Sequence, residues 1–344
     1  MVQTLKQAIR NPKVRIALQL TFTIVVLVLL FNSINISDLS RFLSSIKILP
    51  LIFSLLVTFL MRFLWAYQIS ITQAPMDMHF STYEIFRIQM IATFYSLVLP
   101  GDLLAGGVSW YKLSRPERKY IEAGALLVFF RLVQISCLIL LGLIVAFLDP
   151  QIGSPEFRTL IIVGILSIII MWILFFSNQV MRILDFIVSK VNSDSSFLTN
   201  LYENVERILD TILKFRTLGM NRLIFVFCVS LTAQFLGLVY FFLLARSVDI
   251  DLPFYVIGWI STFVTVIQMI PISIAGLGIR EASYAVLLRD YGISPEQAIS
   301  FSITIFVVFV IVGLIGGLFE LSDIYRNWQR RKKPDSDPSK NITN

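Results

Sequence analysis

The chain alternates between long apolar runs and short polar segments, and this alternation predicts helices that cross a bilayer. The hydrocarbon core of a bilayer is about 30 Å thick, so a crossing helix needs roughly 20 predominantly apolar residues. Two further apolar regions, within residues 67–119 and 254–293, are interrupted by residues that break helices. The uninterrupted runs, which carry few or no charges, span residues 16–37, 48–65, 121–148, 159–181, 223–245 and 295–321.

The first interrupted region begins as an amphipathic helix, turns apolar and then meets four helix-breaking residues. We interpret Pro100-Gly101 and Gly106-Gly107 as strong breakers, because such pairs favour turns. Cations follow at residues 112–119, which predicts that this side faces the cytoplasm. Since both ends of the region look cytoplasmic, its apolar part should enter the membrane and return without crossing.

The second interrupted region carries charge next to its break. Pro271, Gly276 and Gly278 precede an adjacent Arg280 and Glu281, and apolar sequence resumes at once. Exposed backbone and charge at membrane depth are tolerated only where protein buries them or a water-filled cavity receives them. We therefore expect this region to enter from the outside and to line such a cavity.

Cations at the two ends of the chain predict its orientation. Lysine and arginine cluster before the first run and after residue 325, and such clusters mark the cytoplasmic side. The fold class predicted is an all-α polytopic membrane protein with six full crossings and two re-entrant broken-helix hairpins, roughly eight membrane segments, with both termini in the cytoplasm. One crossing follows each broken region, and paired interrupted segments are typical of inverted-repeat transporters.

The division of the chain follows from the same pattern. We expect one membrane domain over residues 1–325 and a basic, disordered cytoplasmic tail over residues 326–344. Residues 182–222 form the longest polar stretch and contain an amphipathic segment. That segment either lies on the cytoplasmic surface of the membrane or caps the helices as a soluble element. The expected location is the plasma membrane, with several crossings.

Composition excludes a soluble globular domain. The 344 residues are 56% hydrophobic and 15% charged, with a mean hydropathy of +0.79, whereas globular domains carry roughly a quarter charged residues. The net charge of +7 does not indicate nucleic acid, because the cations lie mostly at the ends of apolar runs, where they orient helices and contact anionic lipids. One histidine and two cysteines do not indicate a metal or haem site, so we expect no cofactor.

Polar side chains inside the crossings are the next candidates for function. Arg131 lies ten residues into its run, about 15 Å deep, with Gln134 on the same face. An arginine at this depth either faces a cavity or belongs to a structural ion pair. Gln234 near the middle of its run either joins two helices or contacts a ligand. Arg62 either extends its side chain to the cytoplasmic interface or points inward.

The chemistry that this arrangement favours is the binding of an anion. A helix that starts near Arg280 leaves backbone N–H groups unpaired at its positive end, and Gly276 and Gly278 let a ligand approach the backbone. Arg280 adds a full charge, and Arg131 is a second candidate cation; together they suit a phosphate group. Glu281 either pairs with one of these cations or attracts an amine of the substrate. In the alternative, Arg280 and Glu281 neutralise each other in a loop that binds nothing.

The motif around Arg280 resembles the flippase-like integral membrane family related to the transmembrane domain of bacterial lysylphosphatidylglycerol synthases (multiple peptide resistance factor). The resemblance extends over about residues 10–325. It rests on four stretches: PISIAGLGIREA at 271–282, YSLVLPGDLLAGG at 95–107, FRL at 130–132 and AQFLGLVYFFLLARSV from Ala233.

The resemblance implies that the chain translocates lipids between leaflets, in some members an aminoacylated phospholipid. It implies a binding motif and a set of companion residues, with departures at Phe130, where an acidic residue is expected, and at Lys112. These departures leave the substrate open. The motif residues are Pro271, Gly276, Gly278, Arg280 and Glu281, and the companions are Pro100, Gly101, Gly106, Gly107 and Arg131.

Three functions remain compatible with the sequence. The favoured one is a transporter for a lipid with an anionic or zwitterionic headgroup, an aminoacyl-phospholipid or a lipid-linked precursor among them. The second is a scaffold or accessory subunit for a lipid- or glycan-modifying enzyme. The third, a membrane enzyme acting on lipid-linked substrates, lacks the histidine, aspartate pair or metal site that such enzymes usually use, and we expect neither enzymatic activity nor an aminoacyl-transferase domain. Membrane lipids are the expected partners; a homo-oligomer and a partner enzyme stay open.

Overall fold

The computed structural model describes residues 46–97, 102–152, 155–175, 211, 213–269 and 279–332. Within these ranges the regular structure is entirely helical, with nine α-helices and no strand. Four helices are long and apolar enough to cross a membrane: α4 (Ile48–Thr72), α7 (Tyr120–Phe147), α11 (Met220–Ser247) and the part Pro295–Arg326 of α14 (Pro295–Lys332). The all-helical, multi-pass character predicted from the sequence is confirmed, and the crossing expected at residues 16–37 lies outside the described residues.

The helices α7 and α11 match their predicted runs to within three residues. Each is a continuous apolar run between polar segments, which is the pattern that predicts a helix most directly. Helix α8 (Pro155–Phe175) starts four residues earlier than expected, so the loop after α7 is shorter than predicted. Most of the polar stretch 182–222 lies outside the described residues.

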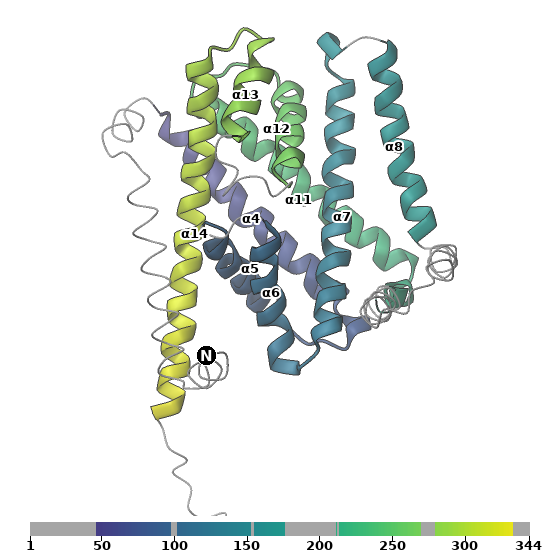
Figure 1. Ribbon diagram of the computed structural model, residues 1–344, viewed down its shortest axis with the longest axis vertical. Coiled ribbons are helices and arrows are strands. Elements are labelled where there is room, and N and C mark those ends of the chain that lie inside the picture. Colours follow the sequence, from purple (N-terminus) through teal and green to yellow (C-terminus); the bar gives the residue numbers. More distant parts are fainter. Residues whose placement is uncertain are drawn as a thin grey trace, which may run out of the picture.

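The two interrupted regions each form a pair of helices separated by a break. The first pair is α5 (Thr82–Ser96) and α6 (Asp102–Glu117), and the second is α12 (Phe254–Gln268) and α13 (Ile279–Arg289). Figure 1 shows α5 and α6 in the lower half of the molecule and α12 and α13 in the upper half, while α7 and α14 run along its height. The two broken pairs therefore occupy opposite halves.

The glycine pair Gly106-Gly107 does not break the chain, which corrects the prediction made from it. Helix α6 begins at Asp102 and continues through both glycines to Glu117. A glycine inside a helix costs only about 1 kcal/mol relative to alanine, so the surrounding residues keep the helix intact. The interruption between α5 and α6 falls instead at residues 98–101, which include Pro100 and Gly101 and lie outside the described residues.

Two helices extend beyond their predicted ends. Helix α4 continues to Thr72, because the polar Gln68 and Thr72 that follow the apolar run are themselves buried, at 1% exposure each. Helix α14 continues to Lys332, so the beginning of the expected disordered tail, residues 326–332, is helical. Polar or charged residues after an apolar run therefore do not mark the end of either helix.

Helices α5 and α14 pack with their backbones in direct contact at the glycines of α14. A Cβ atom built on Gly316 would lie 1.9 Å from the backbone oxygen of Met90, and one on Gly313 would lie 2.5 Å from Leu97 Cδ1. Only a residue without a side chain permits this approach, which is how small residues join helices in membranes.

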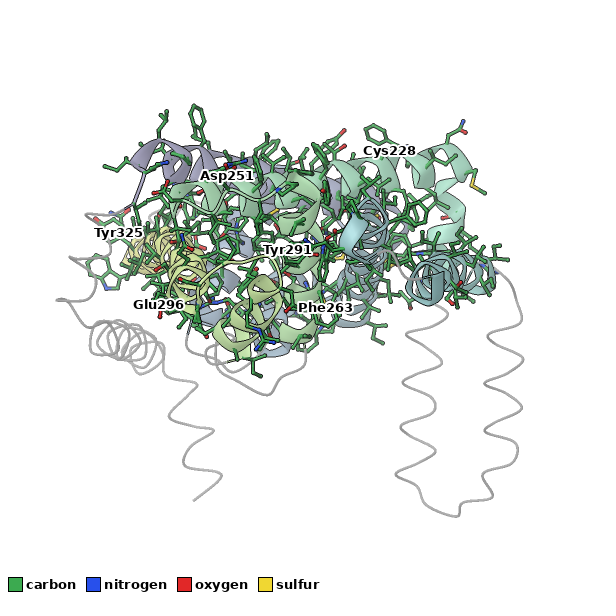
Figure 2. The ribbon with its side chains drawn as sticks, turned by 90° about the horizontal axis from the view of Figure 1, so that it is seen from above. Cys228, Asp251, Phe263, Tyr291, Glu296 and Tyr325 are labelled. Atoms are coloured by element: carbon green, nitrogen blue, oxygen red, sulfur yellow. The ribbon has the colours of Figure 1, made fainter. Side chains whose placement is uncertain are left out.

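Apolar side chains also cover much of the outside. On α4 they form a stripe at helical spacing, consistent with a surface that faces lipid; it comprises Leu49, Ile52, Phe53, Leu56, Leu60 and Phe63. Figure 2 shows Tyr325 of α14 and Cys228 of α11 toward opposite sides of the bundle. Inside, α4 and α11 pack along each other, and Lys47 N–H donates to the carbonyl oxygen of Ser247 at 2.9 Å.

Candidate substrate site

Helix α13 starts directly after the second break, and its first turn holds Arg280 and Glu281. The free N–H groups of a helix start create a partial positive charge, which favours Glu281 and disfavours Arg280. Arg280 is nevertheless buried, with 4% of its side chain exposed. A buried cation at the positive end of a helix is costly, so its surroundings must compensate it.

Three side chains provide that compensation. Arg280 Nη2 lies 2.8 Å from Glu281 Oε1, and Arg280 Nε donates to Ser302 Oγ at 2.7 Å. The Ser302 hydroxyl in turn donates to the same Glu281 oxygen at 2.9 Å, so the three residues form a closed triangle between α13 and α14. The guanidinium group also lies over the ring of Phe306, 5.5 Å from its centroid. We call Arg280, Glu281 and Ser302 the Arg280 triad.

The pairing of Arg280 with Glu281 decides one alternative that the sequence left open. The two charges do neutralise each other, but they do so at unequal depth. Glu281 has 24% of its side chain exposed against 4% for Arg280. The carboxylate is therefore the part of the pair that an approaching group meets first. Tyr284, one turn after Arg280 on α13, is buried and packs edge-on against Phe301, with the ring centroids 4.8 Å apart.

The remaining motif residues have different positions. Pro271, Gly276 and Gly278 lie outside the described residues, as do Pro100 and Gly101. Gly106 and Gly107 are exposed on α6, and a Cβ atom on either would meet nothing within 4 Å. The role of Gly106 and Gly107 as companions of the motif stays a prediction.

Gln134 and Gln234 form a separate contact between α7 and α11. Gln234 Nε2 donates to the backbone oxygen of Gln134 at 3.3 Å, and both side chains are buried. In the part of the chain that the structure describes, no hydrogen bond joins either glutamine to the Arg280 triad. Gln234 thus serves as a contact between helices, the first of the two interpretations offered for it. Arg131, three residues before Gln134, is half-buried on α7.

A second charged cluster was not predicted. Lys112 Nζ of α6 lies 2.5 Å from Glu320 Oε2 and 3.6 Å from Asp323 Oδ2, both on α14. Tyr95 donates to Glu320 Oε1 at 3.1 Å, and Arg87 of α5 pairs with Asp323. Glu320 is only 2% exposed. A sequence signal could have indicated this cluster. Two acids lie at the end of an apolar run, and two cations lie in another segment.

One of three comparisons with known proteins found a match. Comparison with curated proteins and with solved structures found no match. A family model described as the lysylphosphatidylglycerol synthase TM region matches residues 16–317, which include both broken helix pairs and the Arg280 triad. Because the match extends over most of the chain, the protein belongs to the family of the lysylphosphatidylglycerol synthase TM region.

Proposed function

We propose that this protein moves lipids with an anionic or zwitterionic headgroup between the leaflets of a membrane. The observation that carries the proposal is the Arg280 triad: a buried, charged cluster that follows a break in an apolar region and is held between two helices of a multi-pass membrane protein. Intramembrane ionisable groups of this kind mark substrate pathways more often than structural sites.

The triad suits a headgroup that carries both charges. A phosphate can replace the Glu281 carboxylate on Arg280, since both offer oxygen acceptors to a guanidinium group. Glu281, released from Arg280 and more exposed than it, can then receive an ammonium group of the same headgroup. Such an exchange keeps every charge paired throughout, which avoids the cost of several kcal/mol for an uncompensated buried ion.

The arrangement of the broken helices supports transport over a static lipid site. The two pairs occupy opposite halves of the molecule (Figure 1). In transporters with paired broken helices, access alternates between the two sides as one part rocks against the other. In the proposed movement the acyl chains remain along the apolar outer faces, and the headgroup alone passes through the interior.

The test is a leaflet-protection assay with the full chain in proteoliposomes. Dithionite quenches only the outer-leaflet fraction of a fluorescent NBD-labelled lipid unless the protein moves labelled lipid from the inner leaflet to the outer one. With labelled phosphatidylglycerol and phosphatidylethanolamine we expect the quenched fraction to rise above the protein-free value, and to fall back in Arg280→Gln. Arg289→Gln, on the exposed end of the same helix, is the matched control and should transport like the unsubstituted protein. Quenching at the protein-free value with both lipids would refute the proposal.

A further inference from the structure

Asp323 joins two cations that come from different helices. Its Oδ1 accepts from Arg87 Nη2 of α5, and its Oδ2 lies 3.6 Å from Lys112 Nζ of α6. The two oxygens of this carboxylate occupy the positions that two oxygens of a bound phosphate would take, since guanidinium and ammonium groups bind both kinds of anion. Asp323 has 33% of its side chain exposed, against 21% for Lys112 and 14% for Arg87. The carboxylate that joins the cations is therefore nearest to the surface, and an incoming anion meets it first.

Arg87 has a hydrogen-bond donor that Asp323 does not use. In the part of the chain that the structure describes, its buried Nε atom makes no hydrogen bond. The guanidinium group lies over the Phe319 ring of α14, with Cζ 5.6 Å from the centroid, and 5.9 Å from the centroid of Tyr83. These two rings hold the guanidinium group in place. A phosphate can accept from two nitrogens of such a group at once, which is the geometry that arginine favours.

Glu320 is held more firmly than Asp323. It is 2% exposed, it accepts from the Tyr95 hydroxyl at 3.1 Å, and it lies 2.5 Å from Lys112 Nζ. If Asp323 alone turned toward water, two cations and one buried carboxylate would remain, with one positive charge in excess. A phosphate diester carries one negative charge and restores neutrality. A phosphate monoester carries close to two at pH 7 and would leave a negative charge uncompensated, which is costly in a buried site.

We propose that Arg87 and Lys112 form a second headgroup site, which binds the phosphate diester of a phospholipid when Asp323 turns away from the two cations. This inference rests on the function proposed above and specifies its substrate class as a phospholipid with a singly charged phosphate. Glu320 keeps Lys112 in position and balances its charge while the lipid is bound.

The distance between this site and the Arg280 triad suits a path across a membrane. Glu320 and Ser302 lie about 27 Å apart along the axis of α14. That separation is comparable to the roughly 30 Å of hydrocarbon between the two headgroup layers of a bilayer. The two sites also belong to different broken helix pairs, which occupy opposite halves of the molecule (Figure 1). A headgroup that leaves one site can therefore be received by the other.

Native mass spectrometry of the full chain in detergent tests the site with phosphatidylglycerol and with diacylglycerol, which lacks the phosphate. The background is Arg280→Gln, which removes binding at the triad; if that variant does not fold, the unsubstituted chain takes its place. We expect Asp323→Asn to tighten phosphatidylglycerol binding about tenfold, because the lipid no longer displaces a charge-assisted hydrogen bond, and to leave diacylglycerol binding unchanged. Asp290→Asn, an exposed acid, is the matched control and should change neither. An ion cluster that is only structural predicts weaker or unchanged binding in Asp323→Asn, and either result would overturn the inference.

The cation is tested in the same background. Arg87→Gln should weaken phosphatidylglycerol binding about tenfold or more, the usual effect of losing a charge-assisted hydrogen bond. Arg87→Lys keeps the charge but lacks the planar fork, so it should also bind more weakly than the arginine. Arg289→Gln, on an exposed arginine, is the control and should bind normally. Unchanged binding in both Arg87 variants would contradict the site.

Two soluble esters separate a lipid from a free ligand. Glycerophosphoglycerol has the diester phosphate of the lipid without its acyl chains, and glycerol 3-phosphate is a monoester. Neither should displace phosphatidylglycerol at millimolar concentration. Displacement by the diester would overturn the assignment to a lipid in favour of a soluble diester, and displacement by the monoester would contradict the charge balance.

The two proposals fail in different ways. If phosphatidylglycerol crosses in proteoliposomes while the Asp323 and Arg87 variants bind it as the unsubstituted residues do, the second site is wrong and the proposed function stands. If binding changes as expected but no lipid crosses, transport is wrong and the binding site stands.

Discussion

Lys112 and Glu320 form a salt bridge of 2.5 Å although 208 residues separate them in the chain. The contact connects α6 of the first broken pair to the last long helix. Removing one partner of a buried ion pair leaves the other charge uncompensated and costs about 3–5 kcal/mol. Because 21% of the Lys112 side chain is exposed, we expect Glu320→Gln to lower the free energy of unfolding by a value at the low end, about 3 kcal/mol. Thermal unfolding in detergent measures it.

The control for this prediction is an acid of the same kind on the surface. Asp290→Asn, at an exposed position, should change stability by less than about 0.5 kcal/mol. Combining Lys112→Met with Glu320→Gln removes both charges and should cost less than the sum of the single changes. Additive losses would mean that the two charges do not interact.

The contact between Gly316 and the Met90 backbone predicts a large difference between two glycine substitutions. Gly316→Ala places a methyl group where the backbone of α5 already lies, and overpacking of this kind costs about 1–3 kcal/mol or more. The added Cβ atom of Gly107→Ala meets nothing within 4 Å. The substitution lowers the backbone entropy of the unfolded chain, so it should be neutral or stabilise the protein by up to about 1 kcal/mol. Melting temperatures of the two variants compare them directly; equal effects would argue against the close packing.

Ser302 is the neutral member of the Arg280 triad. Replacing it removes hydrogen bonds that support the triad and leaves both charges in place. Ser302→Ala leaves Arg280 Nε without its acceptor, which should cost about 1–3 kcal/mol of stability. Transport should fall less than in Arg280→Gln, because the cation and Glu281 remain. Ser300→Ala, half-buried two positions earlier on α14, is the control and should leave both quantities unchanged. Loss of transport as complete as in Arg280→Gln would give Ser302 a direct role.

A pH-dependent contact joins the loop after α4 to the turn before α7. Lys119 Nζ lies 2.8 Å from Asp77 Oδ2. The hydrogen bond from Lys119, followed by its charge, lowers the pKa of Asp77 below the ordinary 3.8. The same bond raises the pKa of Lys119 above the ordinary 10.5. The stabilisation is therefore complete above the unfolded pKa of Asp77 and below that of Lys119.

Outside this window the stabilisation disappears in both directions. It is lost as the pH falls through the lowered pKa of Asp77, and again as the pH rises through the raised pKa of Lys119. We expect the difference in melting temperature between the unsubstituted protein and Lys119→Met to be constant from about pH 5 to 9 and to shrink below about pH 4 and above about pH 10.5. A difference that does not change at either extreme would show that the pair contributes nothing.

The pattern of apolar and polar residues along the chain was sufficient to predict the helices that are bounded by polar segments. Helices α7 and α11 were predicted because each is an apolar run bounded by polar residues. The end of α4 was not, because Gln68 and Thr72 are polar but buried against neighbouring helices. Hydropathy along the chain assigns such residues to a loop, and only the tertiary packing reveals that they continue the helix.

The site was predicted where its residues are adjacent and missed where they are distant. Arg280 and Glu281 follow one another in the sequence, so their pairing could be foreseen as one of two alternatives. Ser302 reaches Arg280 from another helix, and no spacing along the chain indicates that contact. Arg131 was named as a second candidate cation from its depth and from the resemblance, and that role stays a prediction.

Helix α14 contains Ser302, Gly316 and Glu320 on one continuous rod. It contacts the backbone of α5 at Gly316, about 6 Å along the axis from Glu320 and about 21 Å from Ser302. If the helix pivots there, a small displacement at the Glu320 end is magnified more than threefold at Ser302 and reversed in direction. The helix would then act as a lever of unequal arms, with the ion cluster on the short arm and the proposed headgroup site on the long one.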